Sequence, residues 1–438
     1  MKSLKLLLRF VIVGGLLLVL LVPLLLIRSV IKDRERYRDE AVQRVAQSSA
    51  GEQRFVGPLR YIPWTREVEL KVRDDAGNTT VQRRRETGHL VQAPARLRIE
   101  GVLVPSERRV GLFKVPVYVW QAQVRATFAP MRYEPSPGRV YGQPYLALGI
   151  ADVRGLAGEP SLAVAGRALE LENGSGGLEP TTQGMHAPLP MPGDARDGTL
   201  PALEDVVLDL RLSGTRSLSV VPAGDSNQVT LRSSWPHPSF GGEFLPVERQ
   251  VDANGFRAQW ALSSLATRAQ AQLIEGTRPD ALRVDLFDPV DAYTQADRAS
   301  KYGVLFVLLT FVGFVLLELT RQLRIHPVQY LLVGLALAIF FLLLLSLSEV
   351  VPFWQAYGMS AAACIGLQFF YLAGVLHSRS LAAGFAALLT VLYGVLYGLL
   401  VSEDNALLMG SLLLFGILAA IMWLTRRLDW YELGAQLR

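Results

Sequence analysis

The chain of 438 residues is poor in cysteine: its single cysteine, Cys364, lies inside an apolar run. One thiol cannot form a disulfide within the chain, so a fold held by disulfides is excluded. The polar part of the sequence has no thiols at all. This scarcity therefore neither supports nor excludes an oxidising compartment.

The common catalytic and nucleotide-binding motifs are also missing: there is no G-x-S-x-G, H-E-x-x-H, P-loop or G-x-G-x-x-G pattern. GSGG at 174–177 follows no predicted strand, and RRR at 83–85 is more typical of an exposed loop or strand edge than of an anion site. Five histidines show no metal-ligand spacing: His89, His186, His237, His326 and His377. We therefore predict no enzyme, and no catalytic, cofactor-binding or metal-binding residues.

The long polar region lacks an excess of one charge. Residues 28–301 contain 35 Lys and Arg against 33 Asp and Glu, so most of the formal net charge of +5 comes from short segments beside the apolar runs. A nucleic-acid-binding surface needs clustered positive charge. We therefore predict no nucleic-acid partner.

Long apolar runs are what the sequence has in abundance, since half of its residues are hydrophobic. Stretches of about twenty such residues match the roughly 30 Å hydrocarbon core of a bilayer at 1.5 Å per helical residue. None shows the polar stripe of an amphipathic helix. The six runs lie at about 10–27, 302–320, 330–348, 353–376, 381–401 and 406–424. The chain is therefore predicted to be a membrane protein, with the lipid bilayer as a partner.

Charges beside the runs sort by sign. Basic residues occupy the N-terminal tail, the loops after the second and fourth runs, and the C-terminal tail: Lys2, Lys5, Arg9, Arg321, Arg324, Arg379, Arg426, Arg427 and Arg438. The loops after the third and fifth runs carry Glu349, Glu403 and Asp404 and no base. Because Lys and Arg in short loops stay cytoplasmic, we predict that both termini are cytoplasmic and that residues 28–301 lie outside.

The N-terminal segment has the basic start and apolar middle of a signal peptide, but no A-x-A-like site follows. We favour an uncleaved anchor. The predicted domains are a cytoplasmic tail and anchor helix at 1–27, a helical stalk at 28–50, a β-rich domain at 51–301 and a five-helix transmembrane bundle at 302–438.

The outer domain shows period-two alternation, which marks half-buried strands of antiparallel sheets. Four segments carry it: Leu97 and Ile99; Tyr118, Trp120, Ala122 and Val124; Val206, Leu208, Leu210 and Leu212; Phe256, Ala258, Trp260 and Leu262. We therefore predict a mainly-β, antiparallel, sandwich-like domain. The turn-rich stretch 172–201 is expected to be a long loop that separates sub-domains 51–170 and 202–290.

In the bundle, small residues at four-residue spacing let helices approach closely: Gly394 and Gly398 in one run, and Gly358, Ala362 and Gly366 in another. Ordinary helix packing explains them better than an oligomer interface. Polar groups within the runs are few. A transporter would need a cavity lined by Gln368, Thr390, Ser346 or Glu318; we favour Glu318 as a surface charge over an ion site.

Several long stretches resemble the CreD family of bacterial inner-membrane proteins. They are 51–63 (GEQRFVGPLRYIP), 241–268, 288–311, 324–349 (RIHPVQYLLVGLALAIFFLLLLSLSE) and 400–431. The resemblance covers essentially the whole chain and is weakest around 172–201. It implies one anchor, a periplasmic domain, a C-terminal bundle, and a role in cell-envelope integrity and in envelope-stress or β-lactam responses. It transfers no catalytic residue.

Three hypotheses remain. The favoured one is a non-enzymatic envelope-integrity protein whose periplasmic domain contacts periplasmic or envelope partners. The second is a transporter or channel built on the C-terminal bundle. The third is a periplasmic sensor, which would need a partner to pass its signal because the cytoplasmic pieces are short.

Overall fold

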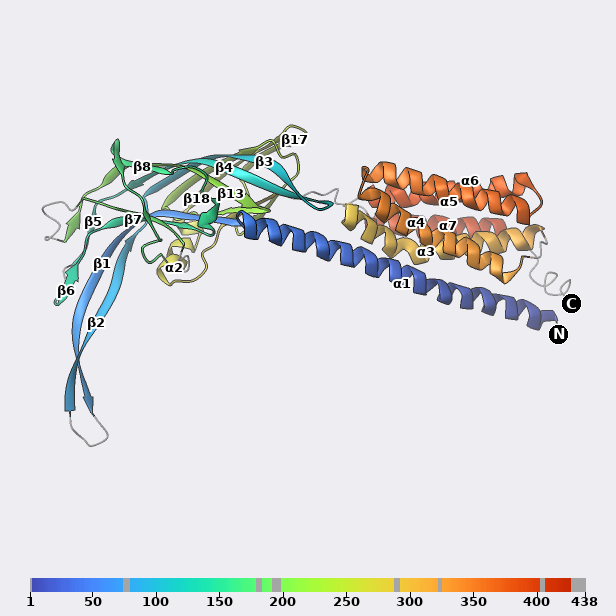
Figure 1. Ribbon diagram of the computed structural model, residues 1–438, viewed down its shortest axis with the longest axis horizontal. Helices are drawn as coiled ribbons and strands as arrows, with labels where there is room; N and C mark the ends of the chain where they lie inside the picture. The colour runs from blue at the N-terminus through green and yellow to red at the C-terminus, as the bar shows by residue number, and fades with distance from the viewer. Residues whose placement is uncertain are drawn as a thin grey trace. The chain divides into compact units, whose positions relative to one another are not determined.

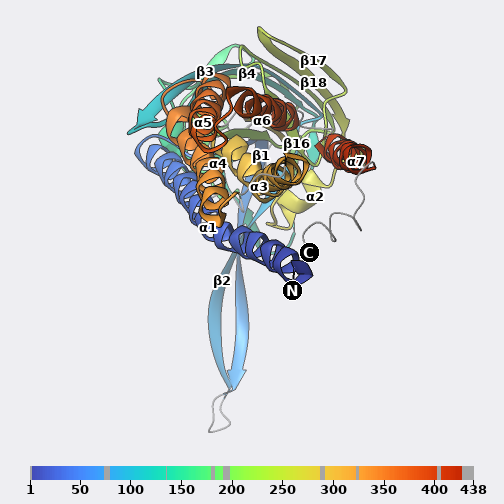
Figure 2. The same cartoon turned by 90° about the vertical axis from the view of Figure 1, so that its right-hand side faces the viewer.

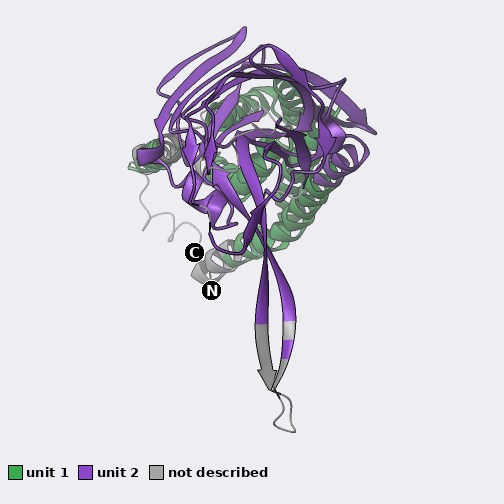
Figure 3. Ribbon diagram, turned by 90° about the vertical axis from the view of Figure 1, so that its left-hand side faces the viewer, with its two compact units in different colours: residues 1–38, 290–438 green, residues 39–289 purple. Residues whose placement is uncertain are grey.

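The computed structural model describes residues 2–73, 79–134, 136–178, 183–190, 198–286, 292–321, 325–401 and 406–426. The chain divides into two compact units (Figure 3). The β unit comprises Asp39–Pro289, and the helical unit comprises Met1–Arg38 with Val290–Arg438. The observed layout is an N-terminal apolar helix, a large mainly-β domain and C-terminal apolar helices, which confirms the predicted fold class.

Two large sheets build the β unit (Figure 1). Among the described residues, the first sheet contains nine strands: β1 (Gln53–Arg73), β2 (Thr79–Gln92), β6 (Arg139–Tyr141), β7 (Tyr145–Ile150), β10 (Glu172–Asn173), β11 (Gly184–Pro188), β14 (Ser217–Val220), β16 (Pro238–Gly242) and β19 (Leu282–Leu286). Its central order is β10-β11-β7-β1-β14-β19-β16, and β2 and β6 pair with β1.

The second sheet, counted over the same residues, has eight strands in the order β17-β18-β15-β3-β4-β13-β8-β9. They are β3 (Arg96–Val110), β4 (Phe113–Phe128), β8 (Ser161–Val164), β9 (Arg167–Leu169), β13 (Leu203–Thr215), β15 (Ser226–Ser233), β17 (Glu248–Asp252) and β18 (Gly255–Ser263). A short pair, β5 (Met131–Arg132) with β12 (Thr199–Leu200), lies apart from both sheets.

Alternation in the sequence explains the core. Along β3, Leu97 and Ile99 are buried while the residues between them are exposed, and Leu208 and Leu212 on β13 follow the same rule. Both sheets contribute to one apolar cluster, in which Phe55 of the first sheet packs edge-on against Trp120 of the second at 5.6 Å between ring centroids. The predicted inward faces are therefore confirmed.

Two features of the topology differ from the prediction. The sheets are mixed, because β1 pairs with β14 and β3 with β15 in parallel. The expected split into sub-domains 51–170 and 202–290 is wrong, because strands from both parts alternate within each sheet. The expected loop 172–201 also contains β10, β11 and β12. Strand pairing between segments far apart in the chain leaves no local pattern, so the sequence did not reveal it.

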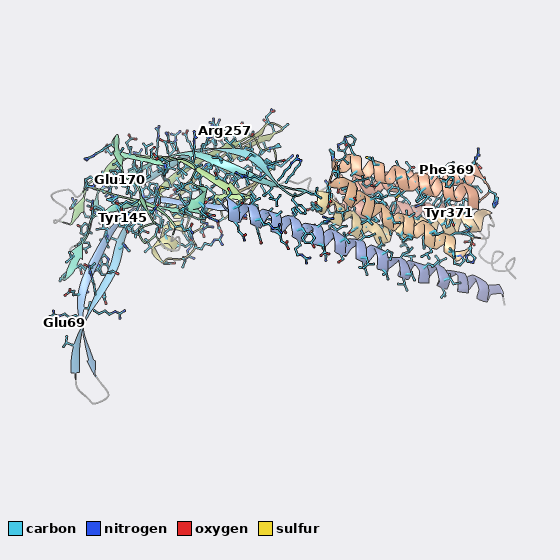
Figure 4. All side chains as sticks on the ribbon, viewed as in Figure 1. Glu69, Tyr145, Glu170, Arg257, Phe369 and Tyr371 are labelled. Atoms are coloured by element: carbon cyan, nitrogen blue, oxygen red, sulfur yellow. The ribbon has the colours of Figure 1, made fainter. Side chains whose placement is uncertain are left out.

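The long strands β1 and β2 extend past the sheet as a two-stranded ribbon (Figure 1), on which Figure 4 marks Glu69. Three pairs of opposite charge face each other across it: Arg66 with Glu86, Glu67 with Arg85, and Glu69 with Arg83. The Arg83 Nε and a Glu69 carboxylate oxygen are 3.3 Å apart. The run 83–85 is thus an exposed strand segment that complements acids on its neighbour.

Short helices complete the β unit: η1 (Val153–Gly155), η3 (Ser264–Ala266) and α2 (Ala269–Ile274). The long helix α1 (Lys2–Ser48) ends inside this unit. At that end Arg154 donates hydrogen bonds to the carbonyls of Ala46 and Gln47, which have no partner within the helix. Asp152 accepts from Arg154 and from the Gly51 N–H, so the two side chains form a clamp at the start of the sheet domain.

The helical unit contains α3 (Ala292–Arg321), α4 (Pro327–Ser348), α5 (Phe353–Val375), α6 (Arg379–Val401) and α7 (Ala406–Thr425) in addition to most of α1. Helix α4 packs against α3 and α5, α6 packs against the same two helices, and α7 contacts α6 at the margin (Figure 2). In the described part of the chain, five helices are long and apolar enough to cross a membrane: α1, α3, α4, α5 and α6. The sixth predicted run, 406–424, forms the helix α7.

The start of α4 explains His326 and Pro327. The His326 side chain accepts from the Val328 N–H as the N-cap, and the Gln329 side chain accepts from the His326 N–H. Pro327 occupies the first turn, where a missing N–H costs little. His326 is therefore a capping residue.

Candidate functional site

The polar residues that a transporter would need do not converge in the bundle. Ser346 and Thr390 are both exposed on the outside of their helices, and the Thr390 hydroxyl donates to the Ala386 carbonyl of its own helix at 2.8 Å. Glu318 accepts a hydrogen bond from Tyr330 at 2.6 Å near the start of α4. Only Gln368 lies deep in the bundle, 2% exposed.

Gln368 and Ser360 share the buried face of α5, and their side-chain polar atoms have no hydrogen-bond partner among the described residues. Nearby, the Tyr357 hydroxyl donates to the Tyr393 carbonyl at 2.7 Å, joining α5 to α6. The small residues Gly358 and Gly366 lie on the exposed side of α5. The polar atoms of Gln368 and Ser360 therefore belong to a contact between helices. Gly358 and Gly366, which were predicted to allow close helix packing, lie outside this contact.

Ion pairs mark one end of the helical unit. Arg28 of α1 lies 3.8 Å from Asp297 of α3, and Arg34 of α1 lies 3.5 Å from Glu349 at the end of α4. Tyr293 donates a hydrogen bond to Glu349 at 3.3 Å. These contacts therefore bring the ends of three spans together at one end of the helical unit. They are the end of the first predicted span, the start of the second and the end of the third.

Two histidines lie in an aromatic cluster of the β unit that includes Tyr61 and Tyr145, the latter marked in Figure 4. Tyr145 donates to the Gly176 carbonyl, and His186 Nδ1 is 2.9 Å from the Gly174 carbonyl. Burial lowers the pKa of His89. The segment 174–177 is thus held through its carbonyl oxygens, which is unsuited to binding a phosphate. No group of three potential metal ligands occurs in the described residues.

A charged residue inside the sandwich is the strongest chemical feature of the β unit. Arg60 is 1% exposed and lies beside Leu146 of β7, on the face of the first sheet that points toward the second. Its Nη2 donates to the Pro201 carbonyl at 3.0 Å, and the guanidinium carbon lies 5.3 Å from the centre of the Phe128 ring. Both Nε and Nη1 lack a hydrogen-bond partner within the described chain.

Among the residues that the structure describes, no acid compensates the charge of Arg60. No carboxylate of the described residues forms an ion pair with it, and burial lowers its pKa to about 10. Removing a charge from water without a partner is unfavourable by several kcal/mol. A buried charged group with a perturbed pKa that lines a hollow is a candidate for a functional site.

Arg60 is one of the residues that line a cavity of about 280 Å³. Apart from Arg60, its lining consists of Pro144, Val164, Arg167, Leu169, Leu189, Pro190, Leu200, Pro201 and Leu203. The residues Pro144, Leu189 and Leu200 are buried, whereas Arg167 and Pro190 are exposed. The cavity therefore runs from a buried charge to the surface through aliphatic walls. An apolar hollow with few polar groups is the usual form of a small-molecule site.

Comparison with known proteins identifies the family. A family model described as "Inner membrane protein CreD" matches residues 5–431. The chain belongs to the CreD family. The CreD protein of Escherichia coli (strain K12), named "Inner membrane protein CreD", is 38% identical over 424 residues, which cover 95% of this chain and 92% of that protein. The resemblance inferred from the sequence is therefore confirmed, and the chain is a multi-pass inner-membrane protein of this family.

Solved structures add little to the CreD assignment. Two structures of an M1 zinc metallopeptidase from Deinococcus radiodurans, one with a Tyr-Ser-Ala substrate bound, align with TM-scores of 0.21 and 0.20. Each alignment has 10% identity and covers 44% of this chain and 42% of the peptidase. A likeness at this level supports no statement about fold or function.

Sequence reasoning missed Arg60, although it lies within a segment that resembles the CreD family. The available signal was an arginine inside the apolar run 55–62, between Leu59 and Tyr61, which are both buried. In a strand with apolar residues on both faces, either face places a charge in the interior. The cavity itself depends on strands far apart in the sequence and had no local signal.

Proposed function

We propose that this CreD-family protein supports cell-envelope integrity and the response to envelope stress or β-lactams, without being an enzyme, through contacts that its β unit makes in the periplasm. The observation that carries the proposal is the sheet sandwich of Asp39–Pro289, a folded body with its own core inserted between two apolar helices of an inner-membrane family. Both the family and its relative in Escherichia coli carry the name of a membrane protein, which mentions no reaction.

In the proposed orientation both termini are cytoplasmic and residues 28–301 are periplasmic. The sorting of basic and acidic loops supports it. The ion pairs of Arg28 with Asp297 and of Arg34 with Glu349 give independent support, since they bring the polar end of α1 to the acidic loop after α4. That loop and the β unit then share one side, as the charge pattern requires.

The β1–β2 ribbon is the part of the β unit that we assign to envelope contacts. It carries exposed charges of both signs in paired rows, and it extends past the sheet that anchors it (Figure 1). An exposed two-stranded ribbon offers both backbone and side-chain groups to a protein partner. Its partners are proposed to be periplasmic or envelope proteins.

The experiment is a deletion strain complemented with the full chain or with a variant whose ribbon charges are reversed. Loss of the gene should change sensitivity to envelope stress or to β-lactams, and the wild-type chain should restore it. Photocrosslinking from the ribbon in living cells should capture an envelope protein. An unaltered envelope response in the deletion strain would contradict the proposal.

A further inference from the structure

We infer that the cavity beside Arg60 binds an aliphatic carboxylate, with the carboxylate against the guanidinium and the alkyl chain along the aliphatic walls. This goes beyond the proposed function, because it assigns a ligand class to a site in the β unit.

The charge of Arg60 selects an anion. The side chain is 1% exposed and donates one hydrogen bond, from Nη2 to the Pro201 carbonyl. Nε and Nη1 have no hydrogen-bond partner among the described residues. Both nitrogens are buried, so a carboxylate would accept their charge-assisted hydrogen bonds, roughly twice as strong as neutral ones, once the guanidinium turns toward the cavity. Arg167 at the outer margin is exposed, so water screens its contribution.

The lining selects an alkyl chain over a peptide. Leucine and valine side chains form most of the wall, and three of the other lining residues are prolines, which have no backbone N–H: Pro144, Pro190 and Pro201. The Pro201 carbonyl already accepts from Arg60. A peptide would leave its own amides unpaired against this wall, at a cost of roughly 1–3 kcal/mol for each buried group, whereas methylenes need no partner.

The size selects a short or medium chain. About 280 Å³ lies just below the range of roughly 300–1,000 Å³ for pockets that enclose drug-sized ligands. The cavity opens at exposed Arg167 and Pro190, so a longer chain can extend outward. A chain of about ten carbons is therefore a suitable probe.

The local fold builds this hollow. The register of β13 with β4 shifts between Leu203 and Val206, and Asp205 within the shift has a positive φ of 54°. Leu203 lies opposite Phe128, whose ring faces the Arg60 guanidinium. β-Bulges commonly re-aim side chains beside binding sites, and here the bulge adjoins the wall of the cavity.

The test uses the full chain in lipid nanodiscs with a decanoic acid that carries a terminal diazirine. After irradiation, peptide mass spectrometry locates the label. We expect label on the segments that line the cavity and competition by decanoate, but not by decan-1-ol, decyltrimethylammonium or the dipeptide Leu-Leu. Labelling in empty nanodiscs, together with the competition experiments, shows how much of the signal comes from probe dissolved in the bilayer.

Three variants of the chain test whether the labelled site is the cavity beside Arg60. Arg60→Met should lower the labelling by about tenfold or more, because a charge-assisted hydrogen bond is lost. Val164→Phe should lower it by filling the cavity while Arg60 stays in place. Arg211→Met, which removes an exposed arginine of β13 outside the cavity, should leave it unchanged. Thermal unfolding of each variant confirms that it folds.

Three results would overturn the inference. Equal labelling of wild type and Arg60→Met would show that the charge of Arg60 does not contribute to binding of the carboxylate. Competition by decan-1-ol as strong as that by decanoate would show a site for any alkyl chain. Competition by Leu-Leu and not by decanoate would identify a peptide site. None of these results depends on an envelope phenotype, so the ligand and the proposed function can fail separately.

Discussion

Arg60 combines a full charge with almost complete burial, and several effects of similar size meet at this residue. Its hydrogen bond to Pro201 and its contact with the Phe128 ring stabilise it. A hydrogen bond from a charged group contributes about 1.5–3 kcal/mol, and a cation–π contact about 0.5–2 kcal/mol. Loss of hydration of an unpaired charge costs several kcal/mol. The favourable and unfavourable effects are of similar size, so the charge of Arg60 adds little net stability to the fold.

The first prediction follows from this balance. Arg60→Met keeps the volume and removes the charge, so the free energy of unfolding should stay within about 1 kcal/mol of wild type. The melting temperature of the full chain should then change by no more than about 4 °C. Trp120→Ala, which empties the core of the same sandwich, should cost about 3–5 kcal/mol and serves as the comparison. If Arg60→Met lowered the free energy of unfolding as much as Trp120→Ala does, Arg60 would have a structural role.

Asp152 shows how a single carboxylate holds an element end. It accepts from Arg154 and from the Gly51 N–H, and Arg154 in turn caps α1. The hydrogen bond from Arg154 holds the pKa of Asp152 below its usual value of 3.8. A depressed pKa means that the carboxylate contributes stability that is fully present above about pH 4 and is lost as the pH falls through the lower, folded-state pKa.

The second prediction concerns this clamp. Asp152→Ala should speed amide exchange at residues 46–51 and destabilise the β unit by about 1–3 kcal/mol, because the Gly51 N–H and three N–H groups of Arg154 lose their acceptor. The difference from wild type should be constant above about pH 4 and should shrink at lower pH. Glu159→Ala, at an exposed position nearby in the chain, is the control. A pH-independent difference would exclude the carboxylate as the cause.

At the residue level, the sequence predicted inward-facing apolar positions well and polar ones poorly. Alternation along β3 and β13 identifies buried residues because a strand has two faces and one faces the core. Arg60 breaks that rule, so the pattern gives no account of it. The capping role of His326 was not predicted, because histidine is not among the usual N-cap residues.

Among the elements, the β1–β2 ribbon depends on charge more than on apolar burial. Its three cross-strand pairs of opposite charge each contribute roughly 0.2–1 kcal/mol, and like charges in the same places are unfavourable. The sequence placed the run 83–85 on an exposed edge but not opposite its acidic partners, since register between strands is set by the whole hairpin.

The third prediction tests the register. Glu67→Arg with Glu69→Arg should open the ribbon and raise amide exchange along β2 several-fold, because two pairs become repulsive. Adding Arg83→Glu and Arg85→Glu restores opposite charges in the observed register and should return exchange to near the wild-type rate. Failure of the fourfold variant to recover would show that the strands pair differently.

For the helices, the apolar runs predicted existence and approximate bounds, because about twenty apolar residues in sequence have few other uses. The predicted run 330–348 corresponds to α4 at Pro327–Ser348, and 381–401 to α6 at Arg379–Val401. The contacts between helices could not be predicted as well from the sequence. The four-residue spacing at Gly358 and Gly366 suggested a close helix contact, yet both glycines lie on the exposed side of α5.

On the scale of the whole molecule, the prediction failed where distant segments pair. Two sub-domains were expected, yet β1 lies beside β14 and β3 beside β15, so one unit spans the region. A loop-like composition at 172–201 hid short strands that complete the first sheet. By contrast, the order of anchor, β domain and apolar helices was predictable, because hydropathy changes sharply at each boundary.

The central claim is that the β unit is displayed in the periplasm by helices whose basic ends stay inside the cell. The fourth prediction and its most direct test use cysteine accessibility, because the only native thiol, Cys364, is buried. Leu265, which is 97% exposed, is replaced by cysteine in the β unit, and Ser380 is replaced by cysteine in the first turn of α6. A membrane-impermeant maleimide is then added to spheroplasts. The account predicts that Leu265→Cys is labelled at once and Ser380→Cys only after the membrane is permeabilised; the reverse pattern would contradict it.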